Sequence, residues 1–337
     1  MKCSRHRCFD GILIFTVQLY IMPFKIQTAG AGENLTVRIE NENTGTYIDV
    51  YALGAVLNQY AIRHNGEDFN CIDAYQKPED VKTLMTQRFQ GSKLSPFVCR
   101  LANGTFAFEN VQYTVGKHFD GKSAIHGLVY DELFELTNES LLADRASIEL
   151  TRKVNAENYG FPFHYTIKIV YTLNENGAVD VETIVTNDSN SVMPINDGWH
   201  PYFKLDEKVD NTLLKFRSKQ MAIFDETLLP TGEFRDYKEF SEFKTIGATE
   251  FDNSFTIDDL DTPALELKSE TQKLYLTVTP KKGYPILQVY IPPARNSIAV
   301  ENLTGLPDSF NNHIGLLTLK PNESKHFATE YHLQRIG

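Results

Sequence analysis

The sequence predicts an all-β protein built as one large antiparallel β-sandwich. From about Asn34 onward, apolar and polar residues alternate with a period of two in many short runs, which is the pattern of half-buried strands. Gly, Pro, Asn and Asp residues separate these runs, as turns require. Only one segment has a helical pattern, so strands do not alternate with helices. This argues against a parallel α/β sheet and for packed antiparallel sheets.

The clearest strand pair lies in the middle of the chain. Alternation is regular over residues 165–171 and 179–185, with the turn Asn174–Gly177 between them, which predicts a β-hairpin. The helix is predicted at Pro78–Phe89, because a proline near the start, acids in the first turn and an arginine in the last turn suit helix ends. Further strands are predicted at residues 35–39, 47–53, 105–115, 147–154, 274–278, 286–291 and 326–333.

We expect a single domain over residues 34–337. A prior of about 150 residues per domain would divide the chain in two, but β-sandwiches often exceed that length and no linker-like run interrupts this region. Residues 1–33 are expected to be an N-terminal extension. Basic residues, the apolar stretch Gly11–Phe24 and small residues follow in the order of a signal peptide, whereas Met22 offers an alternative start. We expect a cytoplasmic protein, or an exported one if this segment is a signal peptide.

Composition limits the classes of partner. The formal net charge is −11 and Lys and Arg form no cluster, which argues against nucleic acid. No stretch reaches the roughly 20 apolar residues of a membrane helix. Cys3, Cys8, Cys71 and Cys99 form neither a CxxC pair nor a dense framework, so we expect reduced thiols and no zinc site. A neutral small molecule is the expected ligand, and the oligomeric state, monomer or dimer, stays open.

Two of four candidate site segments lie in the first half of the chain. Arg100 lies between an apolar run and an Asn-Gly turn, and its guanidinium could fork hydrogen bonds to vicinal hydroxyls. Taken alone, such an arginine is more often exposed or salt-bridged. His126 suits proton transfer near neutral pH, and the missing side chain of Gly127 would let the backbone approach a ligand. A lone histidine is, however, more often structural.

The other two segments lie in the second half. His200 is flanked by Trp199, the only tryptophan, and by the segment 201–203, and aromatic walls beside an imidazole suit a sugar. A histidine within an aromatic core cluster is an equal alternative. Glu301 follows the apolar residues 298–300, so its carboxylate would emerge at the end of a buried strand, where a raised pKa would make it a better base. Most glutamates in such loops are solvated.

Together these segments resemble the galactose mutarotase (aldose 1-epimerase) family over essentially all of residues 34–337. The resemblance implies an antiparallel β-supersandwich, and it depends on the order and spacing of the motifs. These are Pro-Phe-x-x-Arg before an Asn-Gly turn, His-Gly, His-x-Tyr-Phe, FDNSF at Phe251–Phe255, LQVYIPP, and a glutamate followed by Thr-Gly-x-Pro-Asp-x-Phe-Asn.

The family resemblance also implies a reaction, the interconversion of the α and β anomers of a free aldose. Glu301 would be the general base, His200 the general acid, and His126 a second active-site histidine. Opening a hemiacetal ring removes a proton from O1 while another reaches the ring oxygen, so one base and one acid must lie a few Å apart. No redox step, metal or other cofactor is required.

The resemblance assigns sugar contacts as well. Arg100 and Asp252 would grip hydroxyls and Tyr290 would lie near the ring, while Trp199 is expected to contribute an aromatic wall. Around His200 the chain reads GWHPYF rather than the Asn-His-x-Tyr-Phe-Asn of galactose-type members. The sequence therefore leaves open which aldose is the substrate.

Two alternatives remain. The sequence HPYF also resembles a branch acting on hexose 6-phosphates, which would need added cations, with Arg88, Lys93 and Lys204 as candidates. A non-catalytic carbohydrate-binding or sensor protein would keep the pocket but would not need a matched acid and base.

Overall fold

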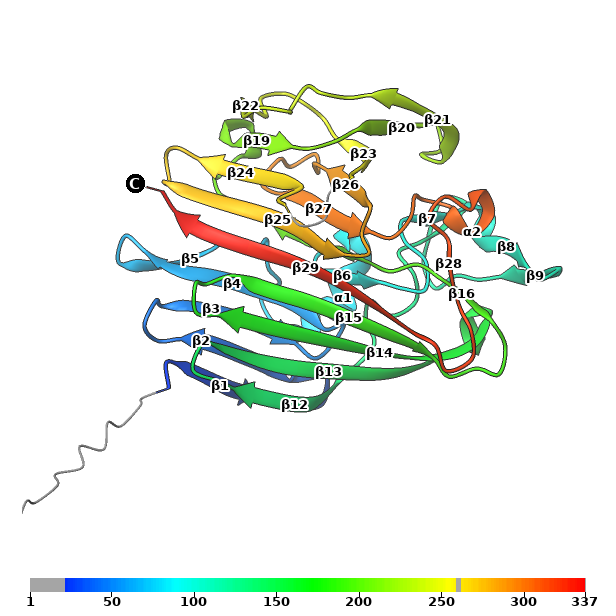
Figure 1. Cartoon of the computed structure of the whole chain (residues 1–337), viewed down its shortest axis with the longest axis horizontal. Coiled ribbons are helices and arrows are strands. Elements are labelled where there is room, and N and C mark those ends of the chain that lie inside the picture. Colours follow the sequence, from blue (N-terminus) through cyan, green and yellow to red (C-terminus); the bar gives the residue numbers. More distant parts are fainter. Residues whose placement is uncertain (1–21, 259–261, 337) are drawn as a thin grey trace, which may run out of the picture.

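The computed structural model describes residues 22–258 and 262–336. Strands dominate this part of the chain, and every strand pair in it is antiparallel, which confirms the predicted fold class (Figure 1). Two large sheets and a five-stranded sheet enclose a continuous apolar core that extends from Phe24 to Leu333. No helix in the described ranges is long and apolar enough to cross a membrane.

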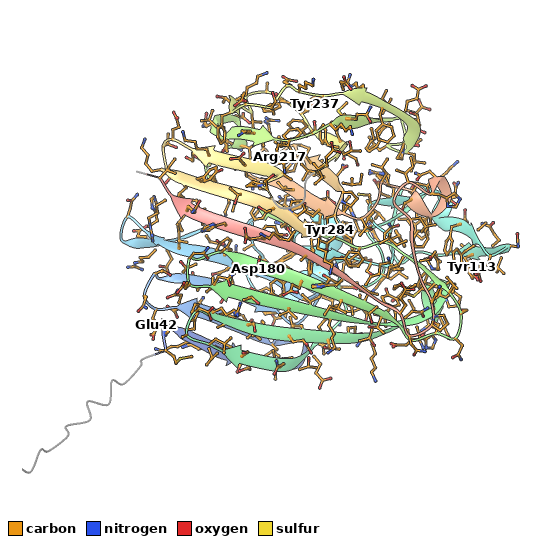
Figure 2. The ribbon with its side chains drawn as sticks, in the orientation of Figure 1. Glu42, Tyr113, Asp180, Arg217, Tyr237 and Tyr284 are labelled. Atoms are coloured by element: carbon orange, nitrogen blue, oxygen red, sulfur yellow. The ribbon has the colours of Figure 1, made fainter. Side chains whose placement is uncertain are left out.

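The nine-stranded sheet contains the predicted hairpin at its centre. Along β15, buried valines alternate with partly exposed residues such as Asp180, so one face packs on the core and the other meets water (Figure 2). In spatial order the strands are β12 (Glu135–Leu141), β13 (Arg145–Ala156), β14 (Phe161–Asn174), β15 (Val179–Asn187), β29 (Ser324–Arg335), β25 (Leu274–Lys282), β24 (Leu265–Ser269), β19 (Leu213–Phe216) and β22 (Lys244–Thr245).

The eight-stranded sheet contains the last part of the FDNSF motif, the LQVY residues and most of the predicted site residues. Its strand β27 is buried along its whole length. In spatial order the strands are β21 (Pro230–Asp236), β20 (Gln220–Phe224), β23 (Asp252–Thr256), β26 (Ile286–Tyr290), β27 (Ile298–Leu303), β17 (Gly198–His200) and β6 (Ser92–Leu94), while β18 (Tyr202–Phe203) also pairs with β27.

The five-stranded sheet begins earlier than expected. Its first strand lies inside the predicted extension 1–33 and pairs with β2 from Phe24↔Asn41 to Ala29↔Thr36, so the boundary at Asn34 is wrong. Phe24 is buried in the core, whereas the sequence alone grouped it with the preceding apolar run. The remainder of the extension, residues 1–21, lies outside the described residues. The strands are β1 (Phe24–Ala29), β2 (Thr36–Asn41), β3 (Thr46–Tyr51), β4 (Val56–His64) and β5 (Glu67–Asn70).

Smaller elements complete the fold. The strand predicted at 105–115 is a hairpin, because Glu109 and Asn110 both adopt positive φ and turn the chain. The predicted helix is present as α1 (Pro78–Arg88), which ends at Phe89 in a left-handed conformation. The other elements are β7 (Arg100–Leu101), β8 (Thr105–Phe108), β9 (Val111–Thr114), β10 (Phe119–Asp120), β11 (Ser123–Ile125), β16 (Met193–Ile195), β28 (Leu317–Leu319), α2 (Ser309–Asn312) and the 3-10 turns η1 (Gly32–Asn34), η2 (Ala102–Gly104), η3 (Glu157–Tyr159) and η4 (Val209–Asn211).

Candidate active site

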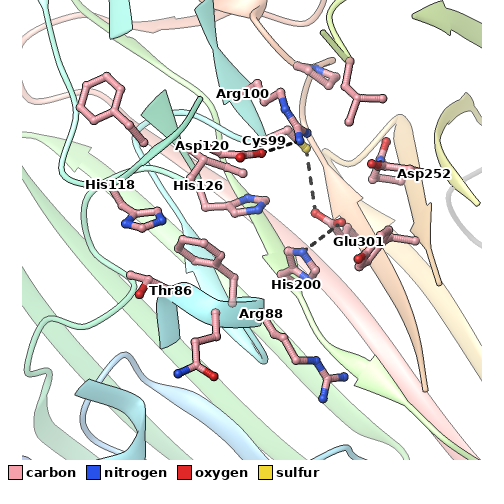
Figure 3. A pocket seen from close by; sticks show the side chains of 18 of the residues that line it. Thr86, Arg88, Cys99, Arg100, His118, Asp120, His126, His200, Asp252 and Glu301 are labelled. Carbon is pink, nitrogen blue, oxygen red and sulfur yellow. Dashed lines mark hydrogen bonds and ion pairs between the residues drawn. The ribbon is translucent and has the colours of Figure 1, made fainter. Parts of the chain in front are cut away.

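A cavity of about 320 Å³ opens over one face of the eight-stranded sheet (Figure 3). It has the volume of a small-molecule site. Six of the seven predicted site residues line it together, although they are spread over two hundred positions of sequence. They are Arg100, His126, His200, Asp252, Tyr290 and Glu301.

Strand register explains why the two acidic residues share the cavity. Glu301 lies directly opposite Gln288 on β26, and Asp252 on β23 lies opposite Tyr290. Directly opposed residues point to the same side of a sheet, as do residues two apart on one strand such as Gln288 and Tyr290. Glu301 therefore emerges from the middle of the buried strand β27, not from its end as the sequence suggested.

The acid and base candidates are in direct contact. His200 Nε2 lies 3.4 Å from Glu301 Oε1, and these residues are only 4% and 2% exposed. His200 is the last residue of β17 and pairs with Ser92 of β6, whereas Glu301 lies on the neighbouring β27. Two groups that are far apart in the chain therefore form one buried proton-transfer pair.

A close approach of two backbone segments places His126. Its N–H donates to the carbonyl of Cys99 at 2.8 Å, and its backbone has φ of +61°. At Gly127 an added Cβ would lie 2.3 Å from the carbonyl oxygen of Ser95. The glycine therefore lets these two chain segments meet, and does not serve the approach of a ligand as the sequence suggested.

Trp199 does not line the cavity, so its prediction as a sugar contact is wrong. Successive residues of a strand point to opposite faces, and His200 takes the cavity face of β17. The indole instead packs in the core, 6.1 Å from the ring of Tyr171 and with Lys93 Nζ 4.5 Å from its centroid. The phenylalanines and tyrosines that line the cavity are Phe89, Phe119, Tyr202, Phe224 and Tyr290.

Burial shifts the pKa values of the contact pair in opposite directions. Removal from water raises the pKa of Glu301 well above its ordinary 4.5, an effect that Asp252 increases and Arg100 reduces. The same desolvation lowers the pKa of His200 to about 3 and holds the pKa of His126 well below 6.5. These directions favour the neutral form of the pair, with a proton on the carboxyl and none added to the imidazole.

A hydrogen-bonded chain fixes the second carboxylate. Ser254 donates to the side-chain oxygen of Gln288, whose amide donates to Asp252 Oδ1 at 2.9 Å. Burial raises the pKa of Asp252, and the nearby cation of Arg100 opposes this rise. Arg100 itself pairs with Asp120 at 2.9 Å at the exposed rim of the cavity.

Sequence reasoning missed several lining residues. Gln288 could have been found, because it lies two positions before Tyr290 in an alternating strand. Phe89 directly follows α1, and no sequence signal relates this helix to the site. Arg88, the last residue of α1, was named from the sequence only as a cation for the phosphate alternative. The chain continues from α1 directly into β6 beside His200, and the Phe89 ring lies 4.5 Å from that of His126.

The cluster of His126, His200 and Glu301 also has the residue types of a metal site. Their ligating atoms lie within 4.8 Å of one another. Zinc bonds of about 2.0–2.1 Å place tetrahedral ligands about 3.4 Å apart, and His200 Nε2 and Glu301 Oε1 are separated by 3.4 Å. The same spacing also suits direct proton transfer between the two groups.

Comparison with known proteins identifies the family of the chain. A family model of aldose 1-epimerase matches residues 36–332. The chain belongs to the aldose 1-epimerase family. It is 29% identical to YihR, an uncharacterized protein of Escherichia coli, over 253 residues that make up 72% of this chain and 78% of YihR. It is also 24% identical to an aldose 1-epimerase of Streptococcus thermophilus over 212 residues, or 60% of this chain and 58% of that protein.

Solved structures of the family share the fold. A galactose mutarotase-like protein of Clostridium acetobutylicum matches with a TM-score of 0.81 and 19% identity, covering 93% of this chain and 99% of that one. A galactose 1-epimerase of Lactobacillus acidophilus matches with a TM-score of 0.79 and 20% identity, covering 94% and 100%. At such low identity these matches confirm the fold, the predicted mutarotase-like supersandwich, and nothing beyond it.

The packing at Gly127 predicts a specific loss of stability. Gly127→Ala should lower the free energy of unfolding by at least about 2 kcal/mol, because a Cβ would collide with the Ser95 carbonyl. Gly66→Ala is the matched control, since its φ is also positive but no atom lies within 4 Å, and it should cost only about 1 kcal/mol. Urea unfolding measures both. Equal losses of unfolding free energy in the two variants would show that the Cβ at position 127 does not collide with the Ser95 carbonyl.

The buried carboxyl predicts a pH-dependent stability difference. A raised pKa in the folded state means that the folded protein loses stability as pH rises above about 4.5, where the unfolded chain ionises freely. Glu301→Gln removes this loss. Its melting temperature relative to that of wild type should therefore rise as the pH increases above about 4.5, until Glu301 ionises in the folded protein. A constant or shrinking difference would show that Glu301 is ionised in the folded state without cost.

Proposed function

We propose that the chain is an aldose 1-epimerase, or mutarotase, that interconverts the α and β anomers of a free hexose. The observation that carries the proposal is the 3.4 Å contact between Glu301 and His200 on the floor of a sugar-sized cavity. Around this pair lie groups that suit hydroxyls, namely Arg100, Asp252 and Gln288. Family membership supports the same reaction.

The proposed reaction moves two protons. Glu301 removes the proton from O1 while His200 donates one to the ring oxygen, and the C1–O5 bond breaks to give the open aldehyde. Rotation about C1–C2 then presents the other carbonyl face. Reclosure returns both protons with the roles reversed and gives the other anomer. The chain's own acid and base suffice for each step, which supports the expectation of a cofactor-independent enzyme.

The pKa directions fit this cycle. The pair holds one proton both before ring opening, on His200, and after it, on Glu301. Burial alone favours the neutral pair, with the proton on Glu301. Sugar hydroxyls that donate to the carboxylate would favour its ionised form, so that both placements of the proton become accessible in the complex.

The charges of the cavity argue against a hexose 6-phosphate. Lys93 is fully buried in the core, paired with Asp197, and Lys204 does not line the cavity. Arg88 does line it, but its guanidinium already pairs with Asp73 at 2.6 Å. Arg100 is likewise paired, and the lining includes Asp120, Asp252 and Glu301. A dianionic phosphate would find no arginine or lysine in the lining that lacks an acidic partner.

A matched acid and base also argue against a purely binding or sensor protein. Binding requires complementary hydrogen bonds, but it gives no reason to bury a carboxyl against an imidazole at the cost of desolvating both. We therefore propose a small neutral sugar as the partner, in agreement with the net charge of −11.

Replacing the base should abolish turnover while leaving binding intact. Glu301→Gln keeps the shape of the side chain but cannot accept a proton, so kcat should fall by about three orders of magnitude or more. Polarimetry of freshly dissolved α-D-glucose and α-D-galactose measures the rate, with spontaneous mutarotation subtracted. Glucose 6-phosphate is the control, and acceleration of that sugar alone would favour the phosphate alternative. Near-normal turnover in Glu301→Gln would refute the assignment of the base.

Protonation of His200 should not lower the activity of the free enzyme near the ordinary pKa of histidine. Because burial lowers the pKa of His200 to about 3, kcat/KM should not fall as the pH is lowered from 7 to 5. Initial rates at low sugar concentration test this. A loss of kcat/KM centred near pH 6.5 as the pH is lowered would show that the histidine is protonated as if it were exposed.

A further inference from the structure

The imidazole of His200 lacks the hydrogen bond that usually orients a catalytic histidine. Its Nε2 faces Glu301, while its buried Nδ1 has no hydrogen-bond partner on another described residue, and the ring otherwise forms a hydrogen bond only with the backbone of His200 itself. In most histidine sites a carboxylate or carbonyl on the second nitrogen fixes the ring. Something else must hold this ring at the angle from which Nε2 reaches both Glu301 and a sugar.

Ring packing supplies that restraint. The Tyr202 ring is stacked on His200 with centroids 5.0 Å apart and planes 13° from parallel. The His126 ring meets His200 edge-on at 4.9 Å and 77°. Tyr202 is itself buried, and its hydroxyl donates to the backbone carbonyl of Arg88 at 3.0 Å. The orientation of His200 thus depends on where Tyr202 lies.

Arg88 holds Tyr202 from the end of α1. Its guanidinium carbon lies 4.9 Å from the centroid of the Tyr202 ring. One terminal nitrogen donates to Asp73 Oδ2 at 2.6 Å and to Ser297 Oγ at 3.0 Å, and Ser297 donates to the same carboxylate at 2.8 Å. Ser297 directly precedes β27, which contains Glu301. The Arg88 network therefore connects the strand of the base to the ring that packs on the acid.

We propose that Arg88 is a positioning residue, which fixes the His200 imidazole by clamping Tyr202 through its ion pair with Asp73. The inference rests on the proposed function, since it assigns Arg88 to the same proton transfer. In Figure 3 Arg88 lies on the His200 side of the cavity, away from Arg100 and Asp252, the groups proposed to bind the sugar.

The charged and titratable groups around His200 set the expected pH effect. Glu301 faces it from β27, Tyr202 from the following strand, His126 from the opposite wall and Arg88 from α1. Arg88 is the cation among them, and a neighbouring cation makes a protonated imidazole a stronger acid. Loss of this charge should therefore move the acid limb of kcat/KM to higher pH.

The first test compares two substitutions of Arg88. Arg88→Met keeps most of the aliphatic part of the side chain but removes the charge. The assay uses whichever of α-D-glucose and α-D-galactose the wild type converts faster than the spontaneous rate. The kcat for that sugar should fall about tenfold to hundredfold, as for a displaced catalytic group. KM should stay within about threefold, because the sugar contacts remain. Arg88→Lys keeps the charge and should recover part of kcat and the wild-type acid limb.

The matched control is Arg63→Met. Arg63 also pairs with an aspartate, Asp68 at 2.9 Å, but on the exposed surface and outside the cavity lining. Its rate, KM and pH profile should equal those of wild type. A rise in KM alone in Arg88→Met would show that Arg88 binds sugar directly and would overturn the clamp.

A double-mutant cycle tests whether Arg88 acts through Tyr202. Tyr202→Leu removes the stacked ring, and Arg88→Met in that background should lower kcat no further. Additive losses would overturn the proposal. Near-UV circular dichroism and thermal unfolding check that each variant is folded. If Arg88→Met and Tyr202→Leu do not fold, the kcat and the pH profile of Arg88→Lys alone test the proposal.

A spectroscopic readout separates this inference from the proposed function. Nitrogen-15 resonances of the His200 ring, assigned with His200→Asn, should shift or broaden in Arg88→Met and stay unchanged in Arg63→Met. If wild type does not accelerate mutarotation, the function fails while this readout still tests the clamp. Unchanged His200 resonances in folded Arg88→Met would refute the clamp even in an active enzyme.

Discussion

The contact between Glu301 and His200 depends on burying two ionisable groups together on one face of a sheet. Each group alone would lose solvation without compensation, and together they share one proton instead of carrying two unshielded charges. The surrounding structure serves to keep this pair dry, close and correctly oriented. Register places the carboxyl, a short strand places the imidazole, and ring packing limits its rotation.

The same burial makes the site costly for stability. A carboxyl with a raised pKa lowers the stability of the fold above about pH 4.5, and an imidazole with a lowered pKa lowers it below about pH 6.5. Positive φ values at Cys99 and His126, beside each other in the cavity wall, add backbone strain. An extensive apolar core offsets these costs, and the only long helix among the described residues ends where it contacts the site. Stability and proton transfer are therefore opposed at Glu301.

Strand pattern and motif order allowed much to be predicted, and particular errors show the limit. Alternation located the central hairpin, and end signals located α1. Six site residues were chosen correctly as a group that shares one cavity, although their roles stay proposals. The prediction that Trp199 contacts the sugar was wrong, because alternation shows that successive residues of a strand point to opposite faces but does not show which face meets the cavity. Phe24 was missed because its pairing with Asn41, seventeen residues later in the chain, leaves no local signal.

By itself the sequence determined the class of fold, the periodicity of each strand and the chemical types available to the site, since these follow from local residue order. Only the tertiary structure decided the partners: that Glu301 lies mid-strand opposite Gln288, that Gly127 serves a contact with Ser95, and that Arg88 reaches Tyr202. Such contacts join segments up to about two hundred residues apart, and their geometry is set by sheet register and packing, which no local pattern encodes.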